Sequence, residues 1–201
     1  MNYLGIDTSG APLSVEMKYG GRYYRYADDD CGARHSAALM PAIDALLRQA
    51  GARLSDFDFF ACVVGAGSFT GIRIGVSAIK ALCFAEQKNC LPLTSFDVLA
   101  YDVPDGSALC AVDARHGAYY VQAYKDFRPA GAAKFVLAEE YETLCRSLPV
   151  AAATEVPHLV YRCNVHEGLR KAIEGKAAEN TGDLAALAPL YIRKSQAEEG
   201  R

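Results

Sequence analysis

Residues 65–75 read Gly-Ala-Gly-Ser-Phe-Thr-Gly-Ile-Arg-Ile-Gly and separate the apolar run Phe59–Val64 from a helical pattern that extends to about Gln87. A short run that is apolar throughout is typical of a central strand covered on both faces. A glycine-rich loop between such a strand and a helix can present backbone N–H groups to an anion. The loop is not a P-loop, because no Gly-Lys-Ser/Thr follows, and Thr70 stands where a dinucleotide fingerprint requires glycine. The spacing alone favours a simpler interpretation, in which the glycines serve tight turns and close helix packing.

The helix after this loop is apolar over more than one face. A surface helix of a globular protein normally has a single apolar face about 100° wide. We therefore expect one side to pack on a sheet and the other to accept a second helix, from the same chain or from a partner. Two neighbouring stripes carry this pattern, Ile72, Val76, Ile79 and Cys83 in one, and Gly71, Gly75, Ala78, Leu82 and Ala85 in the other.

The residues before the loop predict a β-hairpin, a third strand and a helix. Met1–Ile6 is mostly apolar and ends at Asp7, and the residues from Leu13 to Met17 alternate strictly between apolar and polar. A period of two predicts a strand with one buried face. A Gly-Gly turn then leads into the tyrosine-rich strand Arg22–Tyr26. A helical pattern follows over residues 36–50 and ends before a glycine suited to cap it.

The second half of the chain repeats this opening. Ala108–Val112 is apolar, ends at Asp113 and turns into the tyrosine-rich run Ala118–Tyr124. Strand, aspartate, turn and strand thus occur twice, about half the chain apart, which indicates two related lobes. We expect an α/β fold with an N-terminal lobe over residues 1–104 and a smaller C-terminal lobe over residues 105–201. The rest of the second half predicts strands near Phe135, Val150 and Val160 and helices at Glu139–Cys145 and Val165–Ile173.

The composition is that of an ordinary globular protein. The chain has 201 residues, of which 51% are hydrophobic and 22% charged, with a net charge of −3 and no cluster of Lys and Arg. It gives no electrostatic reason to expect strong direct binding to nucleic acid. Seven cysteines without a Cys-x-x-Cys pair indicate reduced, packed thiols. Since no leader pattern and no apolar run of about 20 residues is present, we expect a cytoplasmic protein that is not inserted in a membrane.

Few residues suggest chemistry. Asp7 and Asp113 could position phosphate or magnesium, as the matching carboxylates do in actin-like ATPases, or they could simply cap turns. The candidates for residual nucleotide binding are Asp7, Gly67, Ser68 and Thr70. The four histidines are scattered without the spacing of a zinc site, and no nucleophile elbow surrounds the hydroxyl groups of the loop. We expect no catalytic residue, no metal and no cofactor.

Residues 65–75 resemble the TsaB (YeaZ) family, whose hallmark is Gly-Pro-Gly-Ser-Phe-Thr-Gly-x-Arg-x-Gly. Ala66, in place of the usual proline, is the only departure there. Residues 130–182 match the family only loosely, which leaves the second lobe less defined. Further matches in family order are Leu4–Ser9, His35 and Ser36 with Leu39, Pro41 and Ile43, Val112–Arg115 with Tyr120, and Pro189–Arg193.

The resemblance implies an actin-like (ASKHA, RNase H-like) two-lobed fold with a degenerate second lobe. It implies a non-catalytic subunit for threonylcarbamoylation of adenosine next to the anticodon, in tRNAs that read codons beginning with A. The implied partners are the catalytic subunit TsaD and the ATPase TsaE, with tRNA bound only through the complex and a homodimer when the chain is alone. TsaD carries a His-x-x-x-His metal site where residues 93–99 here contain no histidine. The implied partner interface lies on two helices, at Leu39, Ile43, Leu47, Ile72, Gly75, Val76 and Ile79.

Two other classes of function stay open at this point. One is an independent actin-like ATPase, which the missing phosphate loops argue against. The other is a peptidase of the glycoprotease superfamily, for which the sequence offers neither a metal site nor a nucleophile motif.

Overall fold

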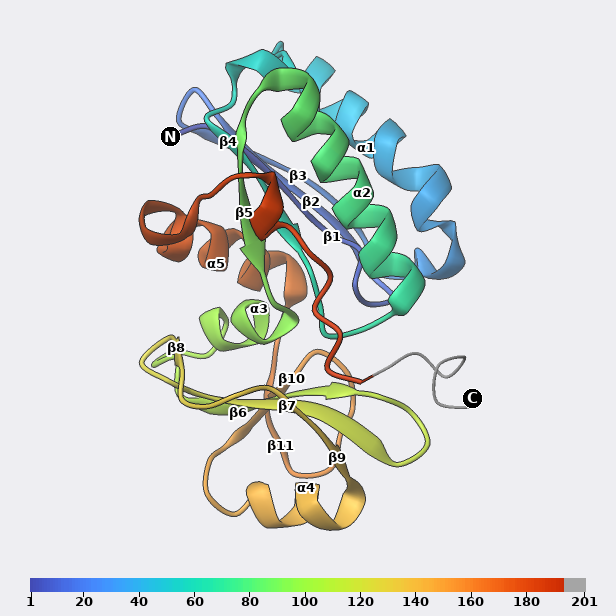
Figure 1. Cartoon of the computed structure of the whole chain (residues 1–201), viewed down its shortest axis with the longest axis vertical. Coiled ribbons are helices and arrows are strands. Elements are labelled where there is room, and N and C mark those ends of the chain that lie inside the picture. The colour runs from blue at the N-terminus through green and yellow to red at the C-terminus, as the bar shows by residue number, and fades with distance from the viewer. Residues whose placement is uncertain (194–201) are drawn as a thin grey trace.

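The computed structural model describes residues 1–193 and contains two β-sheets, one above the other, with helices packed around them (Figure 1). The first sheet has the order β3-β2-β1-β4-β5. Strand β1 pairs antiparallel with β2 and parallel with β4, and β4 pairs parallel with β5. Its strands are β1 (Tyr3–Asp7), β2 (Leu13–Tyr19), β3 (Arg22–Asp28), β4 (Phe59–Val63) and β5 (Asn89–Leu93).

Two long helices, α1 (His35–Ala50) and α2 (Phe69–Glu86), lie together on one face of this sheet (Figure 1). The α1 helix ends where Gly51 adopts the left-handed conformation, with φ of 64°. The α2 helix begins after Ser68, whose hydroxyl accepts a hydrogen bond from the Gly71 amide at 3.2 Å. Such an N-cap satisfies an amide that has no partner within the helix. The strands and helices predicted for the first half are confirmed.

The opposite face of the first sheet is covered by α5 (Val165–Asn180), a helix from the end of the chain. Ile173 of α5 packs in a buried cluster with Tyr3 and Phe59. A Cβ atom at Gly5 would lie only 2.3 Å from the Ile173 Cδ1 atom, so the helix approaches the strand closely because of this glycine. The prediction that β2 has one buried face is wrong, since α5 also buries the polar residues of that strand.

The second sheet repeats the plan of the first, which confirms the repeat predicted from the sequence. Strand β6 pairs antiparallel with β7 and parallel with β10, as β1 does with β2 and β4. Its order is β11-β10-β6-β7-β8, with β9 also on β7. The elements are β6 (Ala108–Asp113), β7 (Ala118–Lys125), β8 (Arg128–Pro129), β9 (Lys134–Leu137), α4 (Ala138–Leu144), β10 (Val150–Ala152) and β11 (Leu159–Arg162). The short strand β8 was not predicted.

A short helix, α3 (Ser95–Tyr101), lies between the two sheets (Figure 1). The buried carboxylate of Asp97 joins three elements there. It accepts hydrogen bonds from the Tyr124 hydroxyl of β7 at 2.7 Å and from the Lys176 ammonium of α5 at 2.5 Å. It also caps α3 through the Thr94 amide at 2.7 Å. The division into lobes at residue 104 stays a prediction, but α5, which that division assigns to the second lobe, packs on the first sheet.

Single-turn 3-10 helices complete the described chain at Gly32–Arg34 (η1), Leu54–Asp56 (η2) and Leu184–Ala186 (η3). All seven cysteines are free thiols; Cys145 is half-buried and the other six are buried. Within residues 1–193, none of the helices combines the length and the apolar character that crossing a bilayer requires. The same residues contain no group of three or more His, Cys, Asp or Glu side chains placed to hold a metal ion.

Candidate functional site at the glycine-rich loop

The glycine-rich loop, residues 65–68, lies at the carboxyl end of β4, next to the turn that follows β1. The two strands are parallel, so their carboxyl ends meet at the same edge of the sheet. The Ser68 amide donates a hydrogen bond to the Ser9 carbonyl at 2.7 Å, and the Ser95 amide donates to the Gly65 carbonyl at 2.6 Å. The loop is therefore fixed between the first hairpin and the start of α3.

Three glycines allow the loop and α2 to approach Thr8 and Ser9. A Cβ atom at Gly67 would lie 2.2 Å from the Ser9 carbonyl oxygen, and one at Gly71 would lie 2.0 Å from the Thr8 carbonyl oxygen. A Cβ atom at Gly75 would lie 2.6 Å from the Thr8 hydroxyl oxygen. Real Cβ atoms essentially never come closer than 3.0 Å to another heavy atom, so each glycine is required by packing within the chain.

The carboxylate of Asp7 is buried behind this loop. Its Oδ1 atom accepts hydrogen bonds from the Ser9 amide at 2.8 Å and the Ser9 hydroxyl at 2.7 Å. The Ser9 hydroxyl oxygen also lies 3.0 Å from that of Ser95, and the Ser95 hydroxyl donates a hydrogen bond to the Ala66 carbonyl at 2.5 Å. Burial raises the pKa of Asp7, although both bonds from Ser9 oppose the shift. Polar contacts thus link Asp7 through Ser9 and Ser95 to the backbone of the loop.

The structure thus brings together some of the nucleotide candidates and separates others. Asp7, Gly67 and Ser68 converge on Ser9, whereas Thr70 is exposed in the first turn of α2. Ser9 and Ser95 were missed, and no sequence signal points to Ser95, since it reaches the loop only through folding. The other candidate aspartate, Asp113, is exposed and accepts a hydrogen bond from the Arg115 amide at 2.7 Å, as a turn cap does.

The residues predicted for a partner interface lie in the core of the chain itself. Apart from Leu47, which is half-buried, all of them are buried between α1, α2 and the first sheet. The six buried residues offer no exposed surface to a partner, because the apolar stripes of both helices pack on their own sheet, whereas Leu47 is partly accessible. The residues concerned are Leu39, Ile43, Leu47, Ile72, Gly75, Val76 and Ile79.

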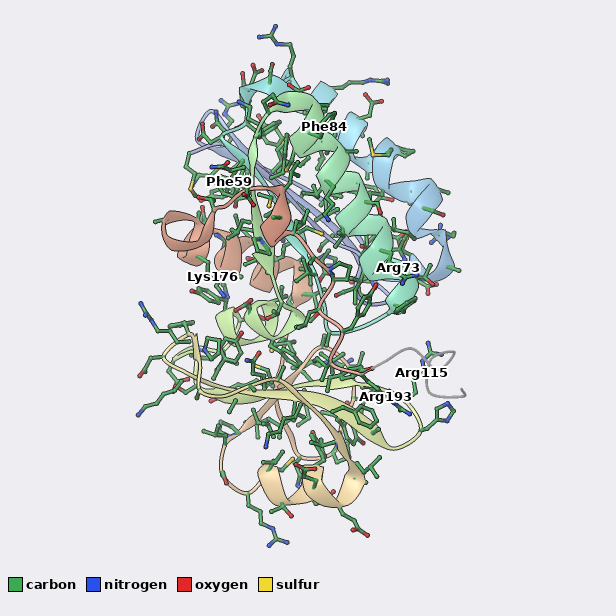
Figure 2. All side chains as sticks on the ribbon, in the orientation of Figure 1. Phe59, Arg73, Phe84, Arg115, Lys176 and Arg193 are labelled. Atoms are coloured by element: carbon green, nitrogen blue, oxygen red, sulfur yellow. The ribbon has the colours of Figure 1, made fainter. Side chains whose placement is uncertain are left out.

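Other residues of the same two helices are exposed and apolar. Met40 of α1 is 48% exposed, and Phe69 and Phe84 of α2 are 39% and 71% exposed. Figure 2 shows Phe84 near the far end of α2 from the second sheet. Phe69 and Phe84 stand near opposite ends of α2, so the exposed apolar side chains are spread along the helix. From the sequence alone, these exposed apolar residues of α1 and α2 cannot be distinguished from the buried apolar residues of the same helices.

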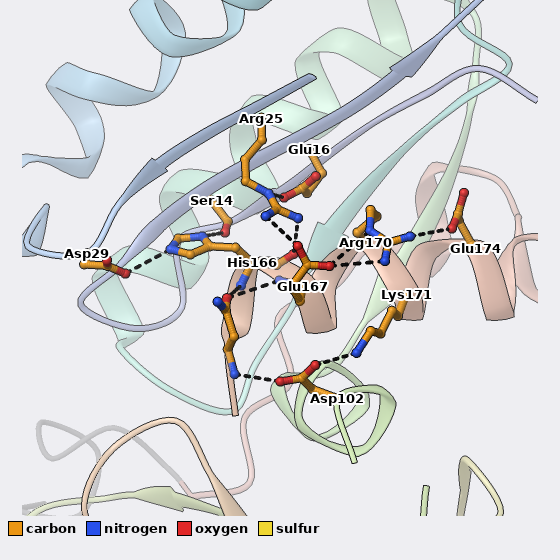
Figure 3. A network of polar contacts seen from close by, with 11 residues as sticks. Ser14, Glu16, Arg25, Asp29, Asp102, His166, Glu167, Arg170, Lys171 and Glu174 are labelled. Carbon is orange, nitrogen blue, oxygen red and sulfur yellow. Dashed lines mark hydrogen bonds and ion pairs between the residues drawn. The ribbon is translucent and has the colours of Figure 1, made fainter. Parts of the chain in front are cut away.

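A second polar cluster lies on the opposite side of the first sheet, where α5 meets β2 and β3 (Figure 3). His166 Nδ1 bonds the Ser14 hydroxyl, and His166 Nε2 lies 3.0 Å from an Asp29 carboxylate oxygen. Ser14 lies on β2 and is only 1% exposed. The Ser-His-Asp order resembles a hydrolase triad, but the buried hydroxyl is not presented to a substrate.

The same cluster holds a buried carboxylate. Glu16 pairs with Arg25, which also bonds Glu167 of α5 at 2.7 Å. Arg170 bonds Glu167 and Glu174 along α5 at 3.1 and 3.0 Å. Burial raises the pKa of Glu16 to about 7 despite the pairing with Arg25. The pair between Arg25 and Glu167 attaches α5 to the β2–β3 hairpin, and the two pairs of Arg170 lie within α5.

The comparisons with known proteins agree with this architecture. A family model described as "TsaD: tRNA N6-adenosine threonylcarbamoyltransferase" matches residues 29–149, more than half of the chain. The chain is 27% identical over 124 residues to the "tRNA threonylcarbamoyladenosine biosynthesis protein TsaB" of Haemophilus influenzae, covering 60% of this chain and 52% of that protein. It is 30% identical over 131 residues to the TsaB of Bacillus subtilis, covering 62% and 56%. The match thus spans about half the length of these relatives. The chain belongs to the TsaB (YeaZ) branch of this family.

Two solved structures from Pseudomonas aeruginosa have the same fold as this TsaB-family chain. One, titled "YeaZ", has a TM-score of 0.75 at 23% identity and covers 94% of this chain and 99% of its own. The other, titled as an uncharacterized protein with similarity to peptidase YeaZ, has a TM-score of 0.77 at 24% identity and covers 96% and 99%. The expected actin-like α/β fold is confirmed.

Proposed function

We propose that this chain is the non-catalytic subunit of a tRNA threonylcarbamoyltransferase. In this role it binds a TsaD-like catalytic subunit, together with a TsaE-like ATPase, and supports modification of adenosine next to the anticodon. Transfer RNA is bound through the complex, and the chain forms a homodimer when it is alone. Membership of the TsaB (YeaZ) branch is the observation that carries this proposal.

The geometry of the glycine-rich loop supports a scaffold role. Gly67, Gly71 and Gly75 touch Thr8 and Ser9 so closely that a phosphate cannot lie between these segments. The Ser68 amide, which could face an anion, donates instead to the Ser9 carbonyl. The loop of this chain therefore orients α2, and α2 with α1 presents exposed apolar residues to a partner.

A deletion strain tests the proposal directly. Loss of the chain should lower threonylcarbamoyladenosine in bulk tRNA, as measured by mass spectrometry of the nucleosides, and expression of the intact chain should restore it. Unchanged modification in a verified deletion strain would refute the assignment.

A second candidate function is hydrolysis, suggested by Ser14, His166 and Asp29. The observation against it is the burial of Ser14 beneath α5. A Ser14→Ala variant should therefore support tRNA modification as well as the intact chain does, provided that it folds.

A further inference from the structure

The last described residues, Leu187–Arg193, form a strap that runs from the first sheet to the second (drawn in red in Figure 1). Leu187 is fully buried in the core under α1 and α2. The Leu190 amide donates a hydrogen bond to the Val64 carbonyl at 2.7 Å. A Cβ atom at Gly65 would lie 2.9 Å from the Leu190 carbonyl oxygen. The strap therefore packs directly on the start of the glycine-rich loop.

Tyr191 of the strap contacts the N-terminal part of α2. The Arg73 Nε atom donates a hydrogen bond to the Tyr191 hydroxyl at 2.8 Å. The Arg73 guanidinium carbon lies 3.7 Å from the centre of the Phe69 ring, and the Phe69 and Tyr191 rings are 5.1 Å apart. Stacking of arginine on an aromatic ring is favourable even at exposed sites. Tyr191 and Phe69 are both partly exposed, so this contact lies at the surface.

The next two residues extend the strap to the second sheet. Ile192 packs against the buried cluster that contains Phe96 of α3 and Tyr124 of β7. The Arg193 guanidinium carbon lies 4.6 Å from the centre of the Phe135 ring on β9. Figure 2 shows Arg73 beside α2 and Arg193 beside the second sheet. Three consecutive strap residues thus contact α2 on one side and the second sheet on the other.

We propose that the strap is a latch that couples the position of the second sheet to the first turn of α2. Because Tyr191 and Arg193 are two residues apart, a shift of β9 relative to the first sheet moves Tyr191 and changes its contact with Arg73. Under the function proposed above, the latch regulates how α2 is presented to the catalytic subunit. Tyr191 and Arg193 are positioning residues in this scheme.

Hydrogen exchange in the isolated chain tests the coupling without any partner. Arg193→Ala removes the stacking of the guanidinium on Phe135, a residue of β9 in the second sheet. The contact is an exposed stack worth about 0.5–1 kcal/mol, so protection of the Leu190 and Ile72 amides should fall roughly two- to fivefold. Lys134→Ala, which removes an exposed cation from the same strand β9, is the matched control and should leave both amides unchanged.

The result at Ile72 decides the matter. Its amide donates to the Ser68 carbonyl at 2.9 Å in the first turn of α2, far along the chain from the mutated residue. Faster exchange at Ile72 in Arg193→Ala, with exchange at Leu190 and Ile72 unchanged in the Lys134→Ala control, supports the latch. Faster exchange confined to the strap, with Ile72 unaffected in a folded Arg193→Ala variant, overturns it. Tyr191→Phe, which keeps the ring but loses the hydroxyl, should give a smaller effect than Tyr191→Ala.

Affinity for a TsaD-like subunit provides a second readout. Arg193→Ala should weaken binding by a factor similar to the loss of protection at Ile72, and Lys134→Ala should not. If the intact chain does not bind the subunit at all, the proposed function fails, while the exchange experiment still decides whether the latch exists.

Discussion

Gly67 has no room for a side chain, since its Cβ position lies against the Ser9 carbonyl and its φ is 150°. Gly67→Ala should therefore destabilise the fold by about 1–3 kcal/mol, as overpacking and backbone strain typically do. Gly131→Ala is the matched control, because nothing lies within 4 Å of its Cβ position. Urea unfolding of both variants measures the difference. Equal midpoints for the two variants would contradict the packing role of Gly67.

Glu16 should make the stability of the fold depend on pH. Its pKa rises from 4.5 in the unfolded chain to about 7 in the folded one because of burial. The folded state therefore keeps the carboxyl proton of Glu16 to higher pH than the unfolded state does. The stabilisation that this protonation gives the fold is fully present below about pH 4.5 and is lost as the pH rises through about 7. The side chain in Glu16→Gln stays neutral at every pH. The free energy of unfolding of this variant, relative to that of the intact chain, should therefore increase by about 2–3 kcal/mol between pH 5 and pH 8.

Chemical denaturation at a series of pH values measures this difference. Arg25, the partner of Glu16, and the nearby Arg170 stay charged throughout, and Asp7 is present in both proteins, so the comparison isolates Glu16. A constant difference between the two proteins across this range would show that Glu16 ionises at its ordinary pKa.

At the scale of the element, α1 and α2 present the surface proposed for the catalytic subunit. Phe84→Asp replaces a ring that is 71% exposed, so the fold should be retained while partner affinity falls about tenfold or more. Val160→Asp is the matched control, since Val160 is an exposed apolar residue on β11 of the other sheet. A pull-down and a binding titration with the TsaD-like subunit compare the two. Normal affinity of a folded Phe84→Asp variant would place the interface elsewhere.

The sequence predicts these helices but not which of their faces is free. Hydrophobic periodicity marks the residues of α2 that avoid water, and an internal sheet satisfies that requirement as well as a partner does. Gly75 and Ile79 therefore looked available for an interface although both are buried. Strand β2 shows the same limit. Its alternation predicts one polar face, but Ser14 and Glu16 are covered by α5, which lies far away in the sequence.

At the scale of the whole molecule, we expect the isolated chain to hydrolyse neither ATP nor peptides. The carboxylate of Asp7 is buried and bonded to Ser9, and the Ser14 hydroxyl is buried under α5. Phosphate release and cleavage of a labelled peptide by the purified chain measure both activities. Turnover of ATP that Asp7→Ala abolishes in a folded protein would contradict the prediction.

The two-sheet plan follows from the sequence more fully than the site does. Asp7 and Asp113 each end a strand and begin a turn, and this local pattern is enough to predict two related sheets. The contacts that join the sheets cannot be predicted in this way. Asp97 meets Tyr124 and Lys176, and Ser9 meets Ser95, only after distant segments have packed. Long-range pairing of this kind leaves no periodic signal in the chain.

The buried free thiols can be used to detect local unfolding, because they react only when the surrounding structure opens. Alkylating reagents attack the thiolate, and burial both raises the pKa of these cysteines and blocks access to them. Cys62 and Cys83 report on the first sheet and α2, and Cys110 reports on the second sheet. Brief alkylation followed by mass spectrometry would therefore time the opening of each lobe separately, in the unmodified protein and without an added label.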